Sequence, residues 1–414
     1  GLVEDDHPEP IGERPPADLA VKPPSDLAMA PSPDLAPPIT GRVWYVSPSG
    51  NDGNAGTLQS PLQSFSGAIS KMKGGDVAFF RAGTYNGTFS LRMAGTAQAQ
   101  YTFRAYPGET PLVTSGGGDG FNVSGSYIVI DGFRIQNKGS GHGIFTDFPS
   151  HHITIQNCDI SNSPNQGILL CGNNNTIYRN ALHDNGTHSA HDHGIYIEGA
   201  NNVIRSNIVY NNFGYGIQLY NGYDLSRNGT QGHNTIEYNY VYHNGFGTQQ
   251  ASPNDANGGM VIGWSATANT IRYNMFCDNA KYGVYLIDGE TNNVMTGNVT
   301  CYNRAGGFFM SSPGGGNSLT GNVSYNDSAF GLSSRSGVSS DNNTYFVANG
   351  SPTLKWSGTS YSLAGFQTAS GNDRNSRIAD PKFTNLPAGS FDWNAAKSYN
   401  FCNTVIGQLC QPMP

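Results

Sequence analysis

The stretch from Gly194-Ile-Tyr-Ile-Glu198 to Asn202-Val-Ile-Arg-Ser-Asn207 contains two phrases that recur through most of this chain of 414 residues. The first phrase, a glycine before two apolar residues in alternation, recurs from Gly120 to Gly331 at spacings of 23, 24, 27, 22, 43, 24, 24 and 24 residues. The second phrase has asparagines at both ends and alternating apolar residues between them. A period near 24 residues, with strands too short to be stable alone, indicates one solenoid coil per repeat.

Asparagine recurs at the same corner of each predicted coil. In coils stacked about 4.8 Å apart, such side chains align into a ladder whose amides bond backbone groups that the turn leaves unpaired. The predicted ladder consists of Asn157, Asn180, Asn207, Asn239, Asn274, Asn298 and Asn322. The fold class that follows is all-β, a right-handed single-stranded parallel β-helix of about ten coils.

The chain divides into a proline-rich tail and a body that carries the repeats. The tail, residues 1–40, is predicted to be an extended linker, or an arm that docks on its own body or on a neighbouring subunit. The body, residues 41–414, is predicted to be the β-helix domain. We expect a cap region at 41–86 with a short helix over 61–73, coils at 87–350, an excursion within 222–233 and 244–258, and an irregular closing segment at 351–414.

The charge distribution argues against a nucleic-acid partner. The net charge is −7, and residues 1–40 contribute −6 of it, from eight carboxylates and two basic residues, which leaves −1 for the body. A nearly neutral body offers little neutralisation of phosphates. The absence of a run of 18 apolar residues argues against a membrane span.

Both ends of the body resemble a known superfamily. Tyr45-Val-Ser-Pro-Ser-Gly-Asn-Asp-Gly-Asn-Ala-Gly-Thr57, Ser60-Pro61 and Gly75-Asp-Val-Ala-Phe-Phe-Arg-Ala-Gly-Thr-Tyr85 are similar to the opening of secreted pectin-lyase-like β-helix proteins, which include the family 9 polysaccharide lyases. Ala379-Asp-Pro-Lys-Phe383 with Phe391-Asp-Trp393 resembles their closing segment. The resemblance implies a β-helix that acts on polysaccharides outside the bacterial cell or at its surface.

The motifs of particular activities in this superfamily are not matched. The aspartate cluster and catalytic lysine of the family 9 lyases have no residue-by-residue counterpart in the sequence. The Asp-Pro-His motif of related alginate epimerases is replaced by Gly194-Ile-Tyr-Ile-Glu198.

Two columns of side chains are predicted to face outward from the glycine-containing strands, because the first and third residues after each glycine are apolar and face inward. The Tyr196 column, two residues after each glycine, contains Phe145, Leu169, Tyr196, Gln218, Val261, Tyr285, Phe309 and Ser333. The Glu198 column, four residues after each glycine, contains Asp147, Cys171, Glu198, Tyr220, Gly263, Ile287, Ser311 and Arg335. Aromatic side chains in these columns indicate either a platform on which sugar rings stack or a surface for packing or assembly. The candidate substrate-binding residues are Phe145, Tyr196, Gln218, Tyr220, Tyr285, Phe309 and Arg335.

Glu198 and Asp147 are the candidate catalytic carboxylates. They share a column and are two coils apart, so their backbones are expected to be about 9–10 Å apart. Inverting glycosidases hold their carboxyl groups roughly 6.5–9.5 Å apart. His193, which precedes Gly194, is a candidate for positioning or for proton transfer. Two unrelated surface carboxylates remain the alternative interpretation.

The charge near these residues favours a hydrolase over a lyase. A lyase requires a base and a cation that neutralises the uronate carboxylate, and the basic candidates nearby are Lys281, Arg304 and Arg335. No ordered metal-ligand spacing is present, so no metal ligands are assigned. Asp52-Gly-Asn54 could bind calcium, but an Asx turn is the preferred interpretation.

The six cysteines support an oxidising location. Cys277 and Cys301 are 24 residues apart at the same coil position, which is predicted to face inward, and form buried thiols or a disulfide. Cys402 and Cys410 are predicted to be bonded. Cys158 is predicted to face inward and Cys171 outward, which argues against their pairing.

Two functions follow from this sequence. The first is a secreted or cell-surface protein that acts on an extracellular polysaccharide along one sheet face, either by binding it alone or by binding and cleaving it. The second is a non-catalytic subunit of an extracellular fibre or surface assembly, with the N-terminal tail docked on its neighbour.

Overall fold

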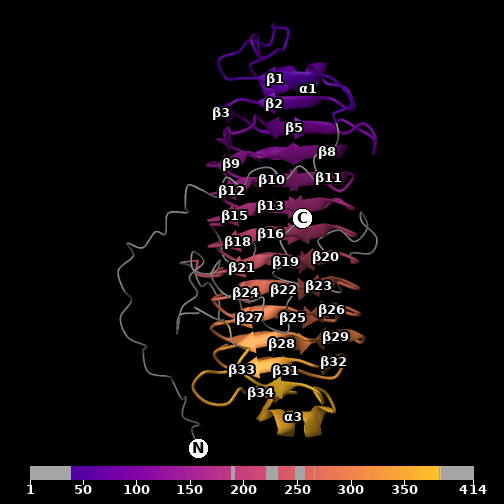
Figure 1. Ribbon diagram of the computed structural model, residues 1–414, viewed down its shortest axis with the longest axis vertical. Coiled ribbons are helices and arrows are strands. Elements are labelled where there is room, and N and C mark those ends of the chain that lie inside the picture. The colour runs from indigo at the N-terminus through magenta and orange to yellow at the C-terminus, as the bar shows by residue number, and fades with distance from the viewer. Residues whose placement is uncertain are drawn as a thin grey trace, which may run out of the picture. The chain divides into compact units, whose positions relative to one another are not determined.

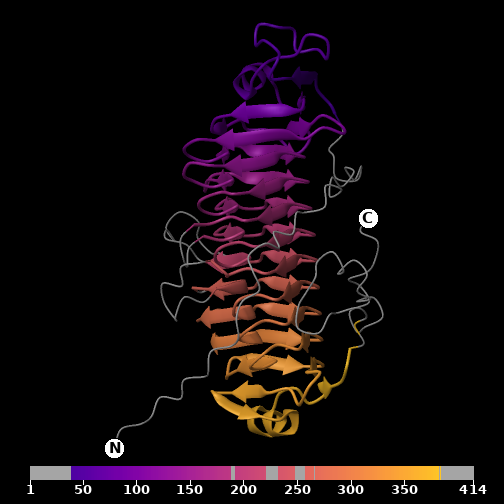
Figure 2. The ribbon, with the colours of Figure 1, turned by 90° about the vertical axis from the view of Figure 1, so that its left-hand side faces the viewer.

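A column of stacked coils makes up the part of the chain that the computed structural model describes, residues 39–187, 192–220, 232–247, 257–264, 266–381 and 383. Three sheets run along this column, and the coils follow one another from the indigo N-terminal end to the yellow C-terminal end (Figure 1, Figure 2). Strands one coil apart pair in parallel, and only the last pair of one sheet is antiparallel. The predicted right-handed parallel β-helix of about ten turns is confirmed.

Each of the three sheets contains twelve strands. Sheet A consists of β1 (Val43–Val46), β2 (Val77–Phe80), β5 (Tyr101–Ala105), β8 (Ser126–Asp131), β11 (His151–Gln156), β14 (Thr176–Tyr178), β17 (Val203–Arg205), β20 (Thr235–Glu237), β23 (Thr270–Arg272), β26 (Val294–Thr296), β29 (Asn317–Thr320) and β32 (Val338–Asp341). Sheet B consists of β3 (Gly83–Asn86), β6 (Pro111–Ser115), β9 (Arg134–Asn137), β12 (Asp159–Ser161), β15 (Ala181–His183), β18 (Ile208–Tyr210), β21 (Tyr240–Tyr242), β24 (Met275–Cys277), β27 (Val299–Cys301), β30 (Val323–Tyr325), β33 (Thr344–Phe346) and β36 (Arg377–Ile378). Sheet C consists of β4 (Phe89–Leu91), β7 (Phe121–Val123), β10 (Ile144–Thr146), β13 (Ile168–Leu170), β16 (Ile195–Ile197), β19 (Ile217–Tyr220), β22 (Gly258–Gly263), β25 (Tyr282–Asp288), β28 (Gly306–Ser312), β31 (Leu332–Ser334), β34 (Leu354–Trp356) and β35 (Thr359–Tyr361).

The core is the channel inside the coils, which apolar residues of all three sheets fill. In β16, Ile195 and Ile197 are fully buried in this core, while Tyr196 between them belongs to the opposite face. The glycine at the start of each sheet C strand from β7 to β31 lies at a tight corner. At Gly194, a Cβ would come within 2.5 Å of Val209 and 2.7 Å of the carbonyl of Gly216. The glycine phrase therefore recurs because the corner has no space for a side chain.

An asparagine ladder lies at each of the three corners. The predicted ladder runs through Asn180, Asn207, Asn239, Asn274, Asn298, Asn322 and Asn343, and in each step the side-chain oxygen accepts from the backbone N–H of the preceding rung. A second ladder runs through Asn175, Asn202, Asn234, Asn269, Asn293 and Asn317. A third runs through Asn185, Asn212, Asn244, Asn279 and Asn303 and ends at Asp327.

The prediction that Asn157 belongs to the first ladder is wrong by one position. The backbone N–H of Cys158 donates to the Asn180 oxygen at 2.9 Å, whereas the Asn157 amide donates to the Asp131 carboxylate at 2.8 Å. Asn157 has a left-handed backbone with φ of 53°. The side chain is therefore directed away from the ladder, and the ladder position in this coil is held by Cys158.

Helices lie at the two ends of the column (Figure 1). The predicted helix within 61–73 is present as α1 (Phe65–Lys71), which Ser64 caps by accepting from the Gly67 N–H. The Phe65 ring is fully buried and lies 4.0 Å from the ring of Phe80. At the C-terminal end the sequence analysis predicted irregular structure, and the chain instead forms α3 (Leu363–Ser370), whose Phe366 is fully buried.

The disulfide between Cys277 and Cys301 is present, but it lies on the outer face of sheet B. Phe276 belongs to the main core, so the neighbouring Cys277 points the other way, into a second cluster with Met275 and Phe383. The predicted inward position was therefore wrong, because the repeat marks the alternation of a strand but not which face is the core. Cys158 and Cys171 are not paired with each other, as predicted, and both are buried free thiols, although Cys171 was predicted to face outward. Cys402 and Cys410 lie outside the described residues.

Three further predictions concern residues that are outside the described ranges, wholly or in part. These are the N-terminal tail up to residue 38, most of the excursion (221–231 and 248–256) and the chain after Phe383. In the described ranges, no helix has the length and apolar character needed to cross a bilayer.

Candidate functional site

The outer face of sheet C presents both predicted columns in register. Phe145 pairs with Leu169, Leu169 with Tyr196, and Tyr196 with Gln218. The Tyr196 column continues through Val261, Tyr285, Phe309 and Ser333. Tyr220 pairs with Gly263 in the Glu198 column. The stacking that the site predictions required is therefore present.

The aromatic residues of this face do not form one continuous stripe. Gln218 and Val261 occupy the rungs between Tyr196 and Tyr285, and Val261 is only 1% exposed. The face therefore has a central cluster near Tyr196 and a separate C-terminal cluster near Tyr285, which lies three rungs away, or about 14 Å.

Glu198 lies at the centre of the central cluster, directly after β16. Its side chain is 8% exposed, and its Oε2 lies 3.4 Å from the thiol of Cys171 on the preceding rung. Burial raises the pKa of Glu198, and hydrogen bonds from Cys171 and Tyr196 partly oppose that rise. Burial raises the pKa of the Cys171 thiol far above its ordinary value, so this thiol is a neutral donor. A raised pKa favours the protonated form of this carboxyl group, which is the form that a general acid needs.

Asp147 lies two rungs from Glu198, directly after β10. The Cys171 N–H donates to the carbonyl of Thr146, and the Glu198 N–H donates to that of Leu170, so Cys171 is the rung between the two carboxylates. Asp147 is half-buried, and its Oδ1 accepts from the backbone N–H of Phe148 at 2.8 Å. The two carboxylates therefore have different surroundings, one buried and one partly hydrated.

His193 lies behind Tyr196 and is fully buried. Its Nδ1 accepts from the backbone N–H of Tyr215 at 3.0 Å, and its ring lies 5.7 Å from the ring of Tyr196 in an edge-to-face arrangement. At Gly214, a Cβ would come within 2.7 Å of the same nitrogen, so this glycine leaves the space that the imidazole occupies. His193 therefore lies where it can position the Tyr196 ring, and its role in positioning or proton transfer stays a prediction.

The other predicted binding residues are dispersed along the face. Gln218 is 8% exposed, and Tyr220 is half-buried next to Tyr196, with a ring distance of 6.1 Å. In the C-terminal cluster, Tyr285 and Phe309 stack at 5.1 Å with an interplanar angle of 8°. The structure thus brings together Glu198, Tyr196, Tyr220 and His193, but not Phe145, Tyr285, Phe309 or the exposed Arg335.

Sequence reasoning missed Trp264 and the part played by Cys171. The indole of Trp264 is 61% exposed and lies 5.5 Å from the Tyr220 ring. Trp264 comes five residues after Gly259, one position beyond the columns that the repeat defines. A tryptophan directly after a strand of the candidate face was the signal that could have found it. For Cys171, the signal was its position between Asp147 and Glu198.

The residues that suggested calcium do not fit a calcium site. The Asp52 carboxylate accepts from the backbone N–H groups of Gln63 and Ser64 and from the Ser64 hydroxyl, so it ties this loop to the start of α1. The Asx turn is made by Asn51, whose Oδ1 accepts from the Gly53 N–H. No group of three His, Cys, Asp or Glu side chains suited to a metal ion occurs among the described residues.

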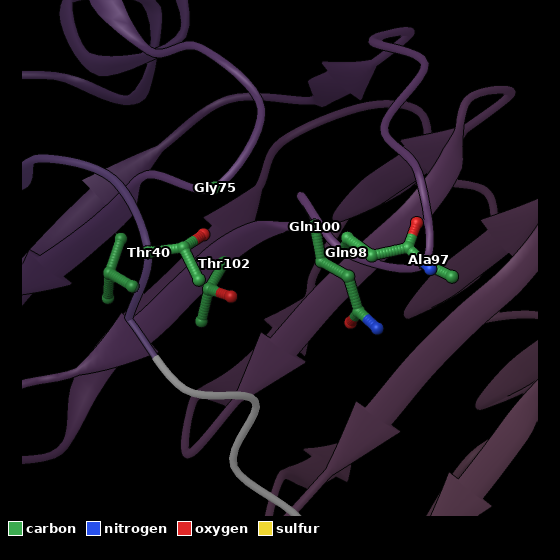
Figure 3. A pocket seen from close by; sticks show the side chains of 7 residues that line it. Thr40, Gly75, Ala97, Gln98, Gln100 and Thr102 are labelled. Carbon is green, nitrogen blue, oxygen red and sulfur yellow. The ribbon is translucent and has the colours of Figure 1, made fainter.

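A pocket of about 360 Å³ lies far from Glu198, near the N-terminal end of the column. Figure 3 shows Thr40, Gln98, Gln100 and Thr102 around it, and Val77, Gly75 and Ala97 complete the lining. None of these side chains ionises near neutral pH, so the lining supplies no carboxyl or imidazole group for acid–base chemistry. The candidate site remains the central cluster on sheet C.

Comparison with known proteins gives relatives among polysaccharide-degrading enzymes. A segment of 89 residues is 38% identical to pectate lyase PEL9 of Emericella nidulans, which covers 21% of this chain and 20% of that protein. A segment of 193 residues is 26% identical to pectate disaccharide-lyase of Dickeya chrysanthemi, which covers 45% of this chain and 25% of that protein. These matches thus span a quarter or less of the length of either relative.

The fold is similar to that of pectate lyase Pel9A, whose crystal structure superposes with a TM-score of 0.59 at 20% identity and covers 85% of this chain and 90% of that one. The family model described as Pel9A-like, right-handed beta helix region, matches residues 44–344. The chain therefore belongs to the Pel9A-like right-handed β-helix family.

Proposed function

We propose that this protein binds an extracellular polysaccharide along the outer face of sheet C and hydrolyses it at Glu198. The observation that carries the proposal is the buried Glu198 carboxyl, which is hydrogen-bonded to Cys171 and lies among aromatic rings on an otherwise regular sheet. Membership in a family that includes polysaccharide-degrading relatives supports the substrate class. The disulfide on sheet B supports a location outside the reducing cytoplasm.

In the proposed reaction Glu198 is the general acid. It gives its proton to the glycosidic oxygen as the bond to the leaving sugar breaks. Asp147 accepts a proton from the water that attacks the opposite face of the sugar ring. A raised pKa in the buried partner and a hydrated environment for the other carboxylate fit this division of roles. Two rungs of separation, about 9–10 Å between backbones, are compatible with an inverting mechanism.

Hydrolysis is preferred to β-elimination because the central cluster holds two carboxylates. An anionic uronate would be repelled there unless a cation intervened. The two pectate lyase relatives compared by sequence match this chain over a quarter or less of their own length, and no step is derived through a metal ion.

The test is the variant Glu198→Gln on whichever polysaccharide the wild-type protein degrades. Turnover should fall by roughly 10²–10⁴-fold while binding persists, because the amide keeps the shape but cannot supply the proton. Glu237→Gln is the control, since Glu237 is also buried but pairs with Arg272 on sheet A. The products should show inverted anomeric configuration by NMR. Unchanged turnover in Glu198→Gln contradicts the assignment, and an unsaturated uronate product contradicts hydrolysis.

The predicted tail of residues 1–40 bears on location and assembly. Residues 1–38 lie outside the described ranges, so the linker or docking role stays a prediction. Deleting residues 1–40 should leave polysaccharide cleavage intact if the protein is the enzyme proposed above. Loss of assembly on this deletion, in a protein without hydrolytic activity, would instead favour the fibre subunit.

A further inference from the structure

Trp264 is an exposed aromatic side chain at a corner of the solenoid. It directly follows β22, with φ of 47°, a left-handed conformation that Tyr238 and Tyr273 also adopt at corners of the solenoid. Its indole is 61% exposed. A large apolar side chain that is open to solvent on the candidate face indicates a binding role.

The neighbours of Trp264 form an aromatic path toward Glu198. The indole lies 5.5 Å from the Tyr220 ring, and the Tyr220 ring lies 6.1 Å from that of Tyr196. Tyr196 hydrogen-bonds to the Glu198 carboxyl. The path covers two rungs of sheet C, from β16 to β22, or about 10 Å.

Gly263 lies at the floor of this path. It pairs with Tyr220 in the Glu198 column, and a Cβ there would lie 3.4 Å from the Tyr220 ring and 3.5 Å from Ile287. A side chain larger than alanine at position 263 would extend from this point over the sheet. The glycine, which is itself buried, therefore lets the ring of Tyr220 pack close to the backbone at this point.

A buried carboxyl group lies in the next coil, in the turn that follows β25. Glu290 is fully buried, and its Oε1 accepts from the backbone N–H of Asp288 at 2.9 Å. Burial raises the pKa of Glu290 to about 7. This hydrogen bond closes the turn on itself.

We infer that Trp264 and Tyr220 form a subsite that stacks neutral pyranose rings of the polysaccharide, on the C-terminal side of Glu198, with the buried ring of Tyr196 behind them. The inference rests on the proposed function and specifies its substrate. Aromatic faces carry partial negative charge, so they attract the C–H faces of sugars and disfavour carboxylates. Glu198 and Asp147 add negative charge on the same face, so the subsite selects neutral sugars over uronates.

The experiment measures binding in the absence of turnover, in the background of Glu198→Gln. The probes are hexasaccharides of β-1,4-linked glucose, mannose and xylose, with a galacturonic acid hexasaccharide as the anionic comparison. Isothermal titration calorimetry is performed on Glu198→Gln alone and with Trp264→Ala, Trp264→Phe or Trp356→Phe added. Trp356 is the control because it lies at the C-terminal end of sheet C, 6.0 Å from the Phe366 ring.

Trp264→Ala should weaken binding of the preferred neutral probe about tenfold or more, whereas Trp264→Phe keeps most of the affinity. Trp356→Phe should change nothing. The melting temperature of Trp264→Ala should be unaltered, because the indole is exposed.

Two results would overturn the inference while leaving the proposed function intact. One is that Glu198→Gln abolishes hydrolysis, but adding Trp264→Ala to it leaves the affinity for the neutral probe unchanged. The other is that the galacturonic acid probe binds more tightly than every neutral probe, and that Trp264→Ala weakens the binding of the galacturonic acid probe alone. If the wild-type protein neither binds nor hydrolyses any of the probes or their parent polysaccharides, the proposed function itself fails.

Discussion

The asparagine ladder and the Glu198 column of the same solenoid differ in the kind of buried polar side chain that they contain. In the ladder from Asn180 to Asn343, one residue type repeats, and every amide bonds the rungs on either side. In the Glu198 column, each rung has a different side chain, among them the carboxyl groups of Asp147 and Glu198 with the Cys171 thiol between them.

This difference helps to distinguish polar side chains that stabilise the fold from polar side chains that belong to the candidate site. A side chain that satisfies the same backbone groups in every coil stabilises the stack, so substitution at any rung has a similar cost. A buried carboxyl that appears in one rung only serves a local purpose. For Glu237 that purpose is the pairing with Arg272, and for Asp327 it is the end of the third ladder. Glu198 lies instead beside the Cys171 thiol on the candidate face.

The largest expected effect comes from breaking the ladder at its centre. Asn239 accepts from both nitrogens of Asn207, and its own amide donates to the carbonyl of Ile204 and the oxygen of Asn274. Asn239→Ala leaves several buried groups without partners, at a cost of roughly 3 kcal/mol or more in the free energy of unfolding. Urea denaturation should show this loss, whereas Asn201→Ala, at an exposed corner, should cost about 1 kcal/mol. Equal costs would contradict the structural role.

A smaller change in the free energy of unfolding, this time a gain, is expected from substitution of Asp327, the carboxyl group at which the third ladder ends. Asp327 is buried and accepts from Asn303, Thr300 and Ser324, and burial raises its pKa to about 6. The unfolded chain loses this proton near pH 4, so the folded state binds more protons between about pH 4 and 6, and stability falls as pH rises through that window.

Asp327→Asn removes the cost of ionising a buried carboxyl group and places another asparagine at the end of the ladder. We expect a gain on the order of 2 kcal/mol at pH 7.5 and no gain at pH 3.5, measured by urea denaturation at both values. A variant that is less stable than the wild type at pH 7.5 would show that the carboxylate is required by the fold.

Glu198→Gln should also raise the free energy of unfolding, but by less than Asp327→Asn. The reason is that hydrogen bonds from Cys171 and Tyr196 oppose part of the rise in pKa that burial causes at Glu198. Stability of the wild type should fall as pH rises from near 4.5 to the raised pKa of Glu198, and the variant should lack this fall. Thermal unfolding at several pH values measures it. A residue that weakens the fold while serving catalysis is expected to show a gain in stability together with lost turnover.

The smallest effect is expected at Cys171, through the pH dependence of hydrolysis. Removing the thiol donor in Cys171→Ala raises the pKa of Glu198 further, so the protonated acid persists to higher pH. In a plot of kcat against pH, the alkaline limb should move to higher pH in Cys171→Ala and return toward its original position in Cys171→Ser. Cys158→Ala, at the buried thiol of the main core, is the control. An unmoved limb would refute the positioning role.

Much of the fold followed from periodicity, and some of the site did as well. The spacing near 24 residues alone predicts that Asp147, Cys171 and Glu198 lie on consecutive rungs. The error at Asn157 and the assignment of Cys277 to the core share one cause. A period specifies which residues are neighbours along the axis, but local backbone angles and the packing of a second layer decide where each side chain points.

Trp264 and Glu290 show the part that periodicity could not supply. Both lie at corners beyond the glycine strands, and their contacts cross from one coil to the next. Their exposure and burial depend on how these corners fold, which no repeat phrase encodes.

By itself the sequence determined the coil, its length and the vertical order of the residues on each face, because stacking requires chemically similar residues at equal intervals. The tertiary structure alone decided that His193 is buried behind Tyr196, that Cys171 donates to Glu198, and that an indole two rungs away lies open to solvent. Burial and hydrogen-bond geometry depend on contacts among several coils at once, and these exist only when the chain is wound.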